Sequence, residues 1–159
     1  MTLRCQCLSK QNDWKGGMMT DRAKVLQVEC AGKLDDIRCT LRDLHRYLQD
    51  SAIPRDWVED LNLVLAEVMT NIARHGYPEE PGIIRVRLRQ TSESLECHIT
   101  DDGIAFDPSR LGRFAPEPAE LREGGYGWCI IRDLTRDICY ERANGRNNLS
   151  FSIPFETMQ

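Results

Sequence analysis

The sequence predicts an α+β fold in which a largely antiparallel sheet has helices on one face. Segments with strand-like alternation of apolar and polar residues occur in the order β-α-α-β-β-loop-α-β-β together with segments that repeat apolar residues at helical spacing. Consecutive strands that pair antiparallel, with the helices collected on one side, form a two-layer α/β sandwich. The segments are justified in chain order below.

The first half of the chain predicts one strand and two helices. Residues 24–30, "KVLQVEC", show the alternation and β-branched content of a strand. A helix is predicted over 34–49 because apolar residues recur at helical spacing, at Leu34, Ile37, Leu41, Leu44 and Leu48. Pro54 suits the first turn of a second helix, which we expect to run to about His75. Gly76 would then stop the helix just past its end, in the left-handed conformation that glycine tolerates.

The second half predicts four strands and a helix around a long loop. "IIRVRLR" (83–89) and "LECHITD" (95–101) both alternate, as half-buried antiparallel strands do. Residues 107–123 contain three prolines and no clean period, which predicts a loop of the length that often forms a lid. "GGYGWCIIRDLTR" passes from glycines into a helix, and a final hairpin turns at Asn144-Gly145.

Composition and charge limit the classes of function. The chain has 159 residues, 41% of them hydrophobic and 29% charged, with no apolar run long enough to span a bilayer. Its 21 Lys and Arg against 25 Asp and Glu give no electrostatic footprint for nucleic acid. We therefore expect a soluble domain over 20–157, after a disordered tail over 1–19, that binds a protein or a small molecule.

The cysteines indicate a reducing, cytoplasmic setting. They number seven, which is odd, and most stand singly inside predicted helices or strands, where a reduced cysteine acts as a small apolar residue. Cys5-x-Cys7 has no second Cys or His pair at ligand spacing, whereas a zinc site needs about four ligands. The sequence offers no complete metal-thiolate set.

Three clusters of residues stand out as candidates for a site, and in the first two a polar side chain interrupts an apolar pattern. Glu67 and Asn71 lie four positions apart on the second helix, so their side chains can face one site, although a solvated pair at the helix margin has the same spacing. Asp101 continues the inward face of its strand, whereas Asp102 points the other way. An inward carboxylate must find a donor. The alternative is that Asp101-Asp102-Gly103 forms only a turn.

The third cluster, "REGGYGWCII", places Gly124, Gly125 and Gly127 directly before a helix. Glycines let the backbone approach a ligand closely, and the free N–H groups at a helix start favour an anion such as phosphate. Taken alone, Gly-x-Gly is a weak indication. No Gly-Lys-Ser/Thr follows, so this is not a Walker motif.

The order of these clusters resembles that of the Bergerat-fold ATPases of the GHKL superfamily, which includes gyrase, heat-shock chaperone, histidine kinase and mismatch-repair ATPases. The resemblance covers nearly all of residues 22–155 and implies a mixed, mostly antiparallel sheet covered on one face by helices. Within the superfamily, "LAEVMTNIARHGY", "DDGIAFDP" and "YERANGRNNL" are most similar to the serine/threonine kinases that act as anti-sigma factors.

The resemblance implies a role for each polar cluster. Asn71 would coordinate the Mg²⁺ that bridges the phosphates of ATP, and Glu67 would accept the proton of the attacking hydroxyl. An amide oxygen is a hard, neutral ligand for Mg²⁺, and a nearby carboxylate is a competent general base. Asp101 would accept a hydrogen bond from the adenine amino group, with Gly103 leaving space beside the base.

The resemblance also implies the phosphate contacts. Gly125 and Gly127, with nearby backbone N–H groups, would surround the phosphates, while the loop over 107–123 would close as an ATP lid. Arg122 is a candidate phosphate contact, or else a solvated arginine of that lid.

Two details at the margins of the site leave room for alternatives. Arg74 and His75 match a basic-His-Gly ending that is common in the superfamily, and His75 would either cap the helix C-terminus or approach the phosphates. Ala105 stands where many members carry a second glycine, so its methyl group could narrow the adenine pocket.

The implied function is an ATP- and Mg²⁺-dependent serine/threonine protein kinase that acts as an anti-sigma factor. It would phosphorylate an anti-sigma-factor antagonist of the STAS type and could sequester a sigma factor, as a cytoplasmic homodimer without direct contact to nucleic acid or membrane. One alternative is a nucleotide-binding regulatory module without phosphoryl transfer, against which Glu67 argues. Another is the catalytic part of a histidine kinase or a gyrase-like hydrolase, for which phospho-acceptor helices and a transducer domain are missing.

Overall fold

A computed structural model of the chain describes residues 24–107 and 127–155. Over these ranges the order of elements is the predicted one. The elements are β1 (Lys24–Ala31), α1 (Leu34–Gln49), α2 (Arg55–Asn71), η1 (Ile72–Gly76), β2 (Ile83–Gln90), β3 (Ser94–Asp101), α3 (Gly127–Leu134), β4 (Arg136–Ala143) and β5 (Arg146–Pro154). The predicted tail over 1–19 and most of the loop over 107–123 lie outside the described residues.

The described strands form one five-stranded sheet in the order β1-β2-β3-β5-β4. Each of the four pairings is antiparallel, so the parallel component of a mixed sheet is not found among the described strands. The hairpin between β4 and β5 turns at Asn144 and Gly145, whose φ angles of 52° and 75° fit the tight turn predicted from this dipeptide.

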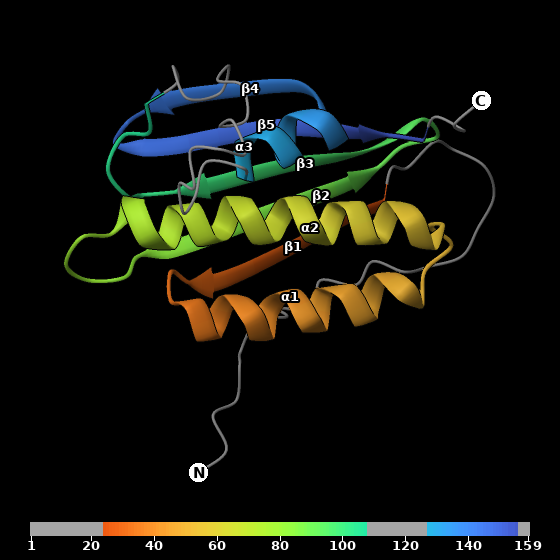
Figure 1. The fold of residues 1–159 in the computed structure, drawn as a ribbon, viewed down its shortest axis with the longest axis horizontal. Coiled ribbons are helices and arrows are strands. Elements are labelled where there is room, and N and C mark those ends of the chain that lie inside the picture. The colour runs from red at the N-terminus through yellow and green to blue at the C-terminus, as the bar shows by residue number, and fades with distance from the viewer. Residues whose placement is uncertain (1–23, 108–126, 156–159) are drawn as a thin grey trace, which may run out of the picture.

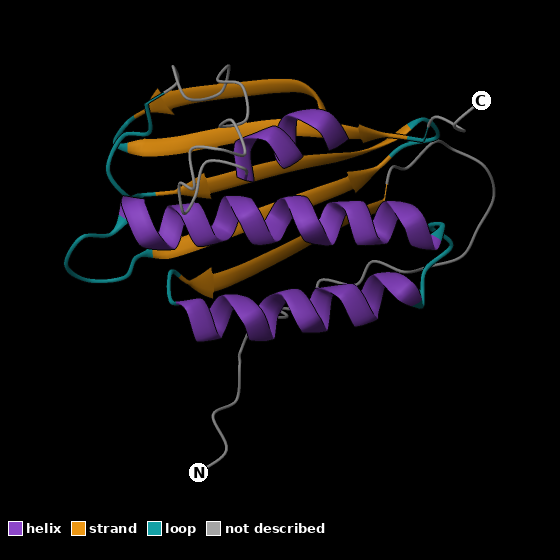
Figure 2. Ribbon diagram, viewed as in Figure 1, coloured by secondary structure: helices purple, strands orange, loops and turns teal. Residues whose placement is uncertain are grey.

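The helices cover one face of the sheet, as Figures 1 and 2 show, with α2 packed between α1 and α3. This follows from the sequence because each central strand buries every second residue. In β2, for example, Ile84, Val86 and Leu88 are buried and the residues between them are exposed. The core between the layers also takes the apolar stripe of α2, including Leu61, Val64, Leu65 and Val68.

The end of the second helix differs from the prediction. Regular α-helix stops at Asn71 and continues as the π-helical segment η1, which contains Gly76. Gly76 is therefore not a left-handed stop beyond the helix, and Gly145 is the one described glycine with a positive φ. A tertiary contact sets this end instead: the Gly76 carbonyl accepts the Ile104 N–H at 2.9 Å.

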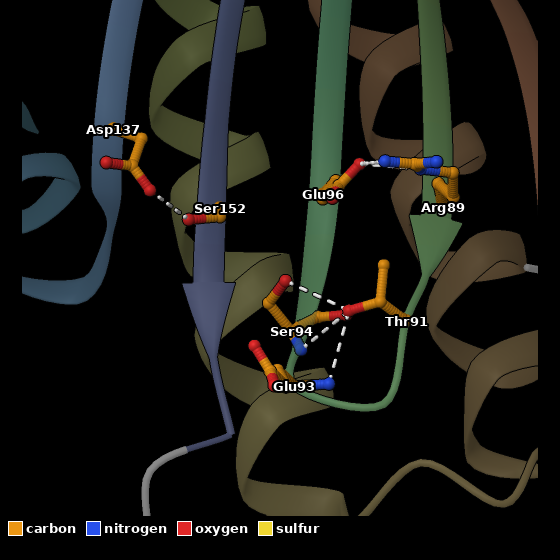
Figure 3. Close-up of polar contacts among 7 residues, drawn as sticks. All are labelled: Arg89, Thr91, Glu93, Ser94, Glu96, Asp137 and Ser152. Atoms are coloured by element: carbon orange, nitrogen blue, oxygen red, sulfur yellow. Dashed lines mark hydrogen bonds and ion pairs between the residues drawn. The ribbon is translucent and has the colours of Figure 1, made fainter.

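The opposite face of the sheet carries mainly polar side chains, and none of the described helices lies over it. Figure 3 shows part of it, where the Arg89 and Glu96 side chains form an ion pair and Ser152 donates to the Asp137 carboxylate at 3.3 Å. A shallow groove of about 310 Å³ crosses this face beside Arg87 and His98.

The five described cysteines lie inside helices or strands, as the sequence predicts. Cys30, Cys97 and Cys129 are buried, Cys39 is half-buried and Cys139 is exposed. Burial raises the pKa of the Cys97 thiol, so this side chain is a neutral apolar group of the core. None of the described helices is long and apolar enough to cross a bilayer.

The turn between β2 and β3 generates a stability prediction. The Thr91 hydroxyl accepts the N–H groups of Glu93 and Ser94, at 3.2 and 3.0 Å, and lies within hydrogen-bond distance of the Ser94 carbonyl (Figure 3). Thr91→Ala should lower the free energy of unfolding by about 1 kcal/mol, because both N–H groups lose this acceptor. Urea titration would measure the change. Thr91→Ser keeps the hydroxyl and should lose much less; equal losses in both variants would contradict this account.

Candidate functional site

Two polar side chains of α2 converge on the start of α3. Glu67 and Asn71 are half-buried on α2, whose neighbouring stripe, including Val64 and Val68, is buried in the core. A side chain at Gly127 would place its Cβ 3.7 Å from Asn71 Nδ2 and in collision with the Glu67 carboxylate. The two side chains therefore face the same small volume at the first residue of α3, as the i, i+4 spacing predicts.

A carboxylate occupies the end of β3, in the orientation that strand parity predicts. Asp101 is 5% exposed, whereas Asp102 is exposed. Asp101 Oδ1 accepts the Gly103 N–H at 2.8 Å and an Nδ2–H of Asn147 at 2.9 Å. Because both of these bonds end on Oδ1, Oδ2 remains the acceptor for a further ligand among the groups that the structure describes.

The helix end and the strand end are joined by backbone. The Gly76 carbonyl at the end of η1 accepts the Ile104 N–H, and a Cβ at Gly103 would lie 2.7 Å from that carbonyl oxygen. We call this contact between Gly76 and the Gly103–Ile104 backbone the joint. Next to it, the Tyr77 hydroxyl donates to Asp102 at 2.9 Å. Burial and this hydrogen bond raise the pKa of Tyr77, so the hydroxyl stays protonated as a donor. The close approach needs glycine at 103.

One cavity of about 750 Å³ connects the two polar centres. It brings together six of the predicted site residues, which are Glu67, Asn71, Arg74, His75, Asp101 and Gly127. Gly103 lies behind Asp101 and shapes the joint without belonging to the wall. The predicted phosphate contacts Gly125 and Arg122 lie outside the described residues.

Three aromatic side chains form one wall of the cavity, next to the start of α3. Phe106 contacts Trp128 with ring centroids 4.8 Å apart, and Tyr140 with centroids 5.5 Å apart. All three side chains line the cavity, as do Ile104 and Ala105. Ala105 is exposed and lines the cavity, so the predicted effect of its methyl group on the adenine pocket stays a prediction.

Sequence reasoning missed Asn147, Tyr140 and Arg142. Asn147 is 6% exposed and pairs with Asp101 across the β3–β5 ladder. The signal was present, because Asn147 stands in the same alternation as the buried Leu149 and Phe151 and is therefore an inward polar residue. Its contact with Asp101, however, depends on a strand register that the local pattern does not specify.

The electrostatics of Asp101 balance burial against nearby donors. Loss of hydration raises the pKa of Asp101 above its ordinary value, and the charge of Asp102 acts in the same direction. Hydrogen bonds from Asn147 and Gly103, together with the Arg142 charge, oppose that rise. The donors favour the ionised carboxylate, in which both oxygens accept hydrogen bonds.

The chemistry of the cavity suits a ligand with two different ends. A carboxylate acceptor at the strand end suits a group with N–H donors, and an amide beside a carboxylate at the helix end suits a metal ion or a reacting hydroxyl. Arg74 and His75 add basic side chains at the same helix end. The missing side chain at Gly127 leaves the backbone of α3 close to this end.

Comparison with known proteins identifies the family of the chain. Residues 30–153 match the family described as histidine kinase-like ATPase domain. The chain belongs to this family. Its members are ATPase domains by description, and the match includes both polar centres and the joint between them.

Similar proteins include named protein kinases. The chain is 30% identical to the serine/threonine-protein kinase BtrW of Bordetella bronchiseptica over 122 residues, which cover 71% of this chain and 84% of that relative. It is 26% identical to the serine-protein kinase RsbW of Bacillus cereus strain AH187 over 126 residues, covering 76% and 79% of the two chains. A shorter match, 34% over 89 residues, links it to RsbW of Bacillus thuringiensis subsp. konkukian and covers 52% and 56%.

The backbone joint generates a prediction. Gly103→Ala should lower stability by about 1–3 kcal/mol and weaken nucleotide binding, because the added methyl group forces the Gly76 carbonyl away from the strand end. Gly145→Ala is the matched control: its φ of 75° costs about 1–2 kcal/mol, but the added Cβ meets nothing within 4 Å. Thermal unfolding and calorimetry with an ATP analogue would separate the two effects. Equal binding in both variants would contradict a role of the joint in shaping the cavity.

Proposed function

We propose that the chain is an ATP-dependent serine/threonine protein kinase that acts as an anti-sigma regulatory factor. The observation that carries the proposal is the single cavity joining Asp101 to Glu67 and Asn71. Its support from comparison is the ATPase family match and the similarity to relatives named as serine- or serine/threonine-protein kinases. We infer that the catalytic domain extends over residues 20–157.

The strand end of the cavity is the proposed purine site. Adenine presents an amino donor where guanine presents a carbonyl acceptor, so an ionised Asp101 attracts the first base and repels the second. Asp101 Oδ2 is the proposed acceptor, since the hydrogen bonds of Gly103 and Asn147 end on Oδ1. The Gly103 N–H, bonded to Oδ1, supports the orientation of the carboxylate that leaves Oδ2 open to a ligand.

The helix end is the proposed site for Mg²⁺ and phosphates. Mg²⁺ typically binds proteins through one or two side-chain oxygens together with substrate phosphates, and the Asn71 amide supplies one such oxygen. Gly125 and Gly127 offer backbone N–H groups to the phosphates, and Arg74, His75 and Arg122 are the candidate basic contacts. The loop over 107–123 is the candidate ATP lid.

Glu67 is the proposed general base. It takes the proton from a serine or threonine hydroxyl of the protein substrate, whose oxygen forms a bond to the γ-phosphorus as the bond to the bridging oxygen breaks and ADP leaves. Most of the remaining catalysis is positioning and charge neutralisation. The half-buried carboxylate beside Asn71 and the start of α3 is suited to this task.

The proposed partners follow from the resemblance to anti-sigma kinases. The protein substrate is an anti-sigma-factor antagonist of the STAS type, and a sigma factor is the second proposed partner, bound by a cytoplasmic homodimer. Neither proposal involves direct contact with nucleic acid or membrane, in keeping with the formal charge of −4.

The general base is tested with Glu67→Gln, which keeps the size of the side chain and removes its basicity. Phosphoryl transfer to candidate antagonist proteins should fall by about 10²–10⁴-fold while binding of an ATP analogue persists. Mass spectrometry of phosphoserine and phosphothreonine would measure transfer. Glu59→Gln, on the same helix and exposed, is the matched control and should keep full activity.

The outcomes distinguish kinase from binding module. Wild-type protein that binds ATP but phosphorylates none of its binding partners would favour a nucleotide-binding regulator without phosphoryl transfer. Wild-type protein that binds no ATP with Mg²⁺ would overturn both readings.

The purine site is tested with Asp101→Asn. The new amide can accept the bonds from Gly103 and Asn147 through its oxygen, which turns its NH₂ group toward the cavity and opposes the adenine amino group. ATP affinity should fall about 10- to 100-fold in calorimetry, as for the loss of a charge-assisted hydrogen bond.

The same Asp101→Asn substitution should raise the stability of the fold while it lowers ATP affinity. Because the folded-state pKa of Asp101 is raised, ionising it costs stability as the pH rises through its titration range, and the neutral amide avoids that cost. Asp102→Asn is the control, since it keeps an acceptor for Tyr77 on the other side of the strand. Unchanged ATP affinity in Asp101→Asn would contradict the proposed purine site.

A further inference from the structure

Asn147 is the centre of a buried hydrogen-bond network at the strand end of the cavity. Its Nδ2 donates to Asp101 Oδ1 and to the Ile104 carbonyl, both at 2.9 Å. Its Oδ1 accepts from the Tyr140 hydroxyl at 2.8 Å and from Arg142 Nη1 at 2.6 Å. Both ends of the amide are therefore occupied, and the side chain is 6% exposed.

The orientation of the Asn147 amide is fixed by Arg142, which can only donate, and by the Ile104 carbonyl, which can only accept. The guanidinium of Arg142 has no acceptor, so the atom of Asn147 that faces it must be the oxygen. The Tyr140 hydroxyl already accepts the Phe106 N–H at 3.0 Å, and its single proton goes to the same oxygen. A flipped amide would place N–H groups against both donors. Nδ2 must therefore face Asp101.

Arg142 also bonds to the loop that follows Asp101. Its Nη1 donates to the Gly103 carbonyl at 3.0 Å, and Asn147 Nδ2 lies 3.4 Å from the same oxygen. The strand pairing places the two residues where they can do this, since Asn147 lies opposite Asp101 in β3 and opposite Arg142 in β4. The network thus holds the carboxylate and its supporting loop as one unit.

The chemistry of Asp101 depends on these donors. An ionised carboxylate accepts at both oxygens, whereas a protonated one presents an O–H donor that would suit a different base. We propose that Asn147, oriented by Arg142 and Tyr140, is a positioning residue that keeps Asp101 an acceptor and so sets the preference of the cavity for adenine. This inference rests on the proposed purine site.

Several charged groups bear on the protonation of Asp101. Burial and the neighbouring Asp102 raise its pKa, while Asn147, the Gly103 N–H and Arg142 lower it. The other titratable groups that line the described part of the cavity are Glu67 on α2, Arg74 and His75 on η1, Asp107 after β3 and Tyr140 on β4. Tyr77, held on Asp102, stays neutral because its pKa is raised. Removing the Asn147 donor should therefore move the titration of Asp101 to higher pH.

The test is Asn147→Leu, which has a similar volume and donates nothing. Calorimetry would measure binding of nonhydrolysable analogues of ATP, of GTP and of the purine triphosphate that lacks the 6-amino group, between pH 5 and 8. The pH below which ATP-analogue binding is lost should rise by about one unit, because a hydrogen bond that favours the ionised form is gone. The preference for the 6-amino base over the base without it should fall about tenfold at the lower pH.

Two further variants keep the test decisive if the buried substitution unfolds the protein. Arg142→Met alters an exposed residue and should shift the pH dependence in the same direction by a smaller amount. Asn148→Leu is the matched control on the other face of β5, where its side chain accepts only from Thr100 at 3.4 Å among the bonds described. It should leave both the pH dependence and the base preference unchanged.

The possible results separate this inference from the proposed function. Wild-type protein without ATP binding would refute the purine site itself. Wild-type protein with a clear adenine preference, together with Asn147→Leu and Arg142→Met variants that keep the same preference and pH dependence, would overturn the inference alone. A uniform loss of affinity for all three analogues, with no shift in pH dependence, would also overturn it, since that is the effect of a structural defect.

Discussion

The backbone contact between Gly76 and Ile104 is the constraint on which the site depends. It fixes the C-terminal end of the second helix against the end of the third strand, so that polar side chains from two layers open into one cavity. The approach is so close that position 103 has room for no side chain. The π-helical segment η1 ends at this joint, and π-turns of this kind are often found at functional sites.

Local patterns predicted most of the fold, because they depend on each element's own buried face. The bounds of α1 were predicted to the residue, and alternation alone assigned Asp101 to the inside and Asp102 to the outside. The end of α2 was not predictable, since a contact 28 positions away along the chain, from Gly76 to Ile104, replaces the glycine stop that the sequence favours. The alternation in its strand indicates that the Asn147 side chain points inward. Its position against Asp101, however, depends on the pairing of β3 with β5.

A buried carboxylate is costly unless donors surround it, and the network around Asp101 shows how the strand end meets that requirement. Two donors bond to Asp101, the Gly103 N–H of its own loop and the Asn147 side chain of β5. Arg142 of β4 acts on it through its bond to Asn147. No described buried side-chain polar atom lacks a hydrogen-bond partner. Only one oxygen of Asp101 is used in this way, so the charge is stabilised while the other oxygen stays available to a ligand.

The helix end differs from the strand end in how its polar side chains are held. Glu67 and Asn71 are half-buried, and no hydrogen bond to either side chain is described within the protein, unlike the fully engaged Asn147. Among the described residues Gly127 lies close to both, and a side chain there would collide with the Glu67 carboxylate. The position of the proposed base and the start of the helix that would face the phosphates are therefore coupled through a single glycine. The end proposed to bind the purine is held by many hydrogen bonds and the end proposed for the chemistry by few among the described residues, and both follow from the same two-layer arrangement.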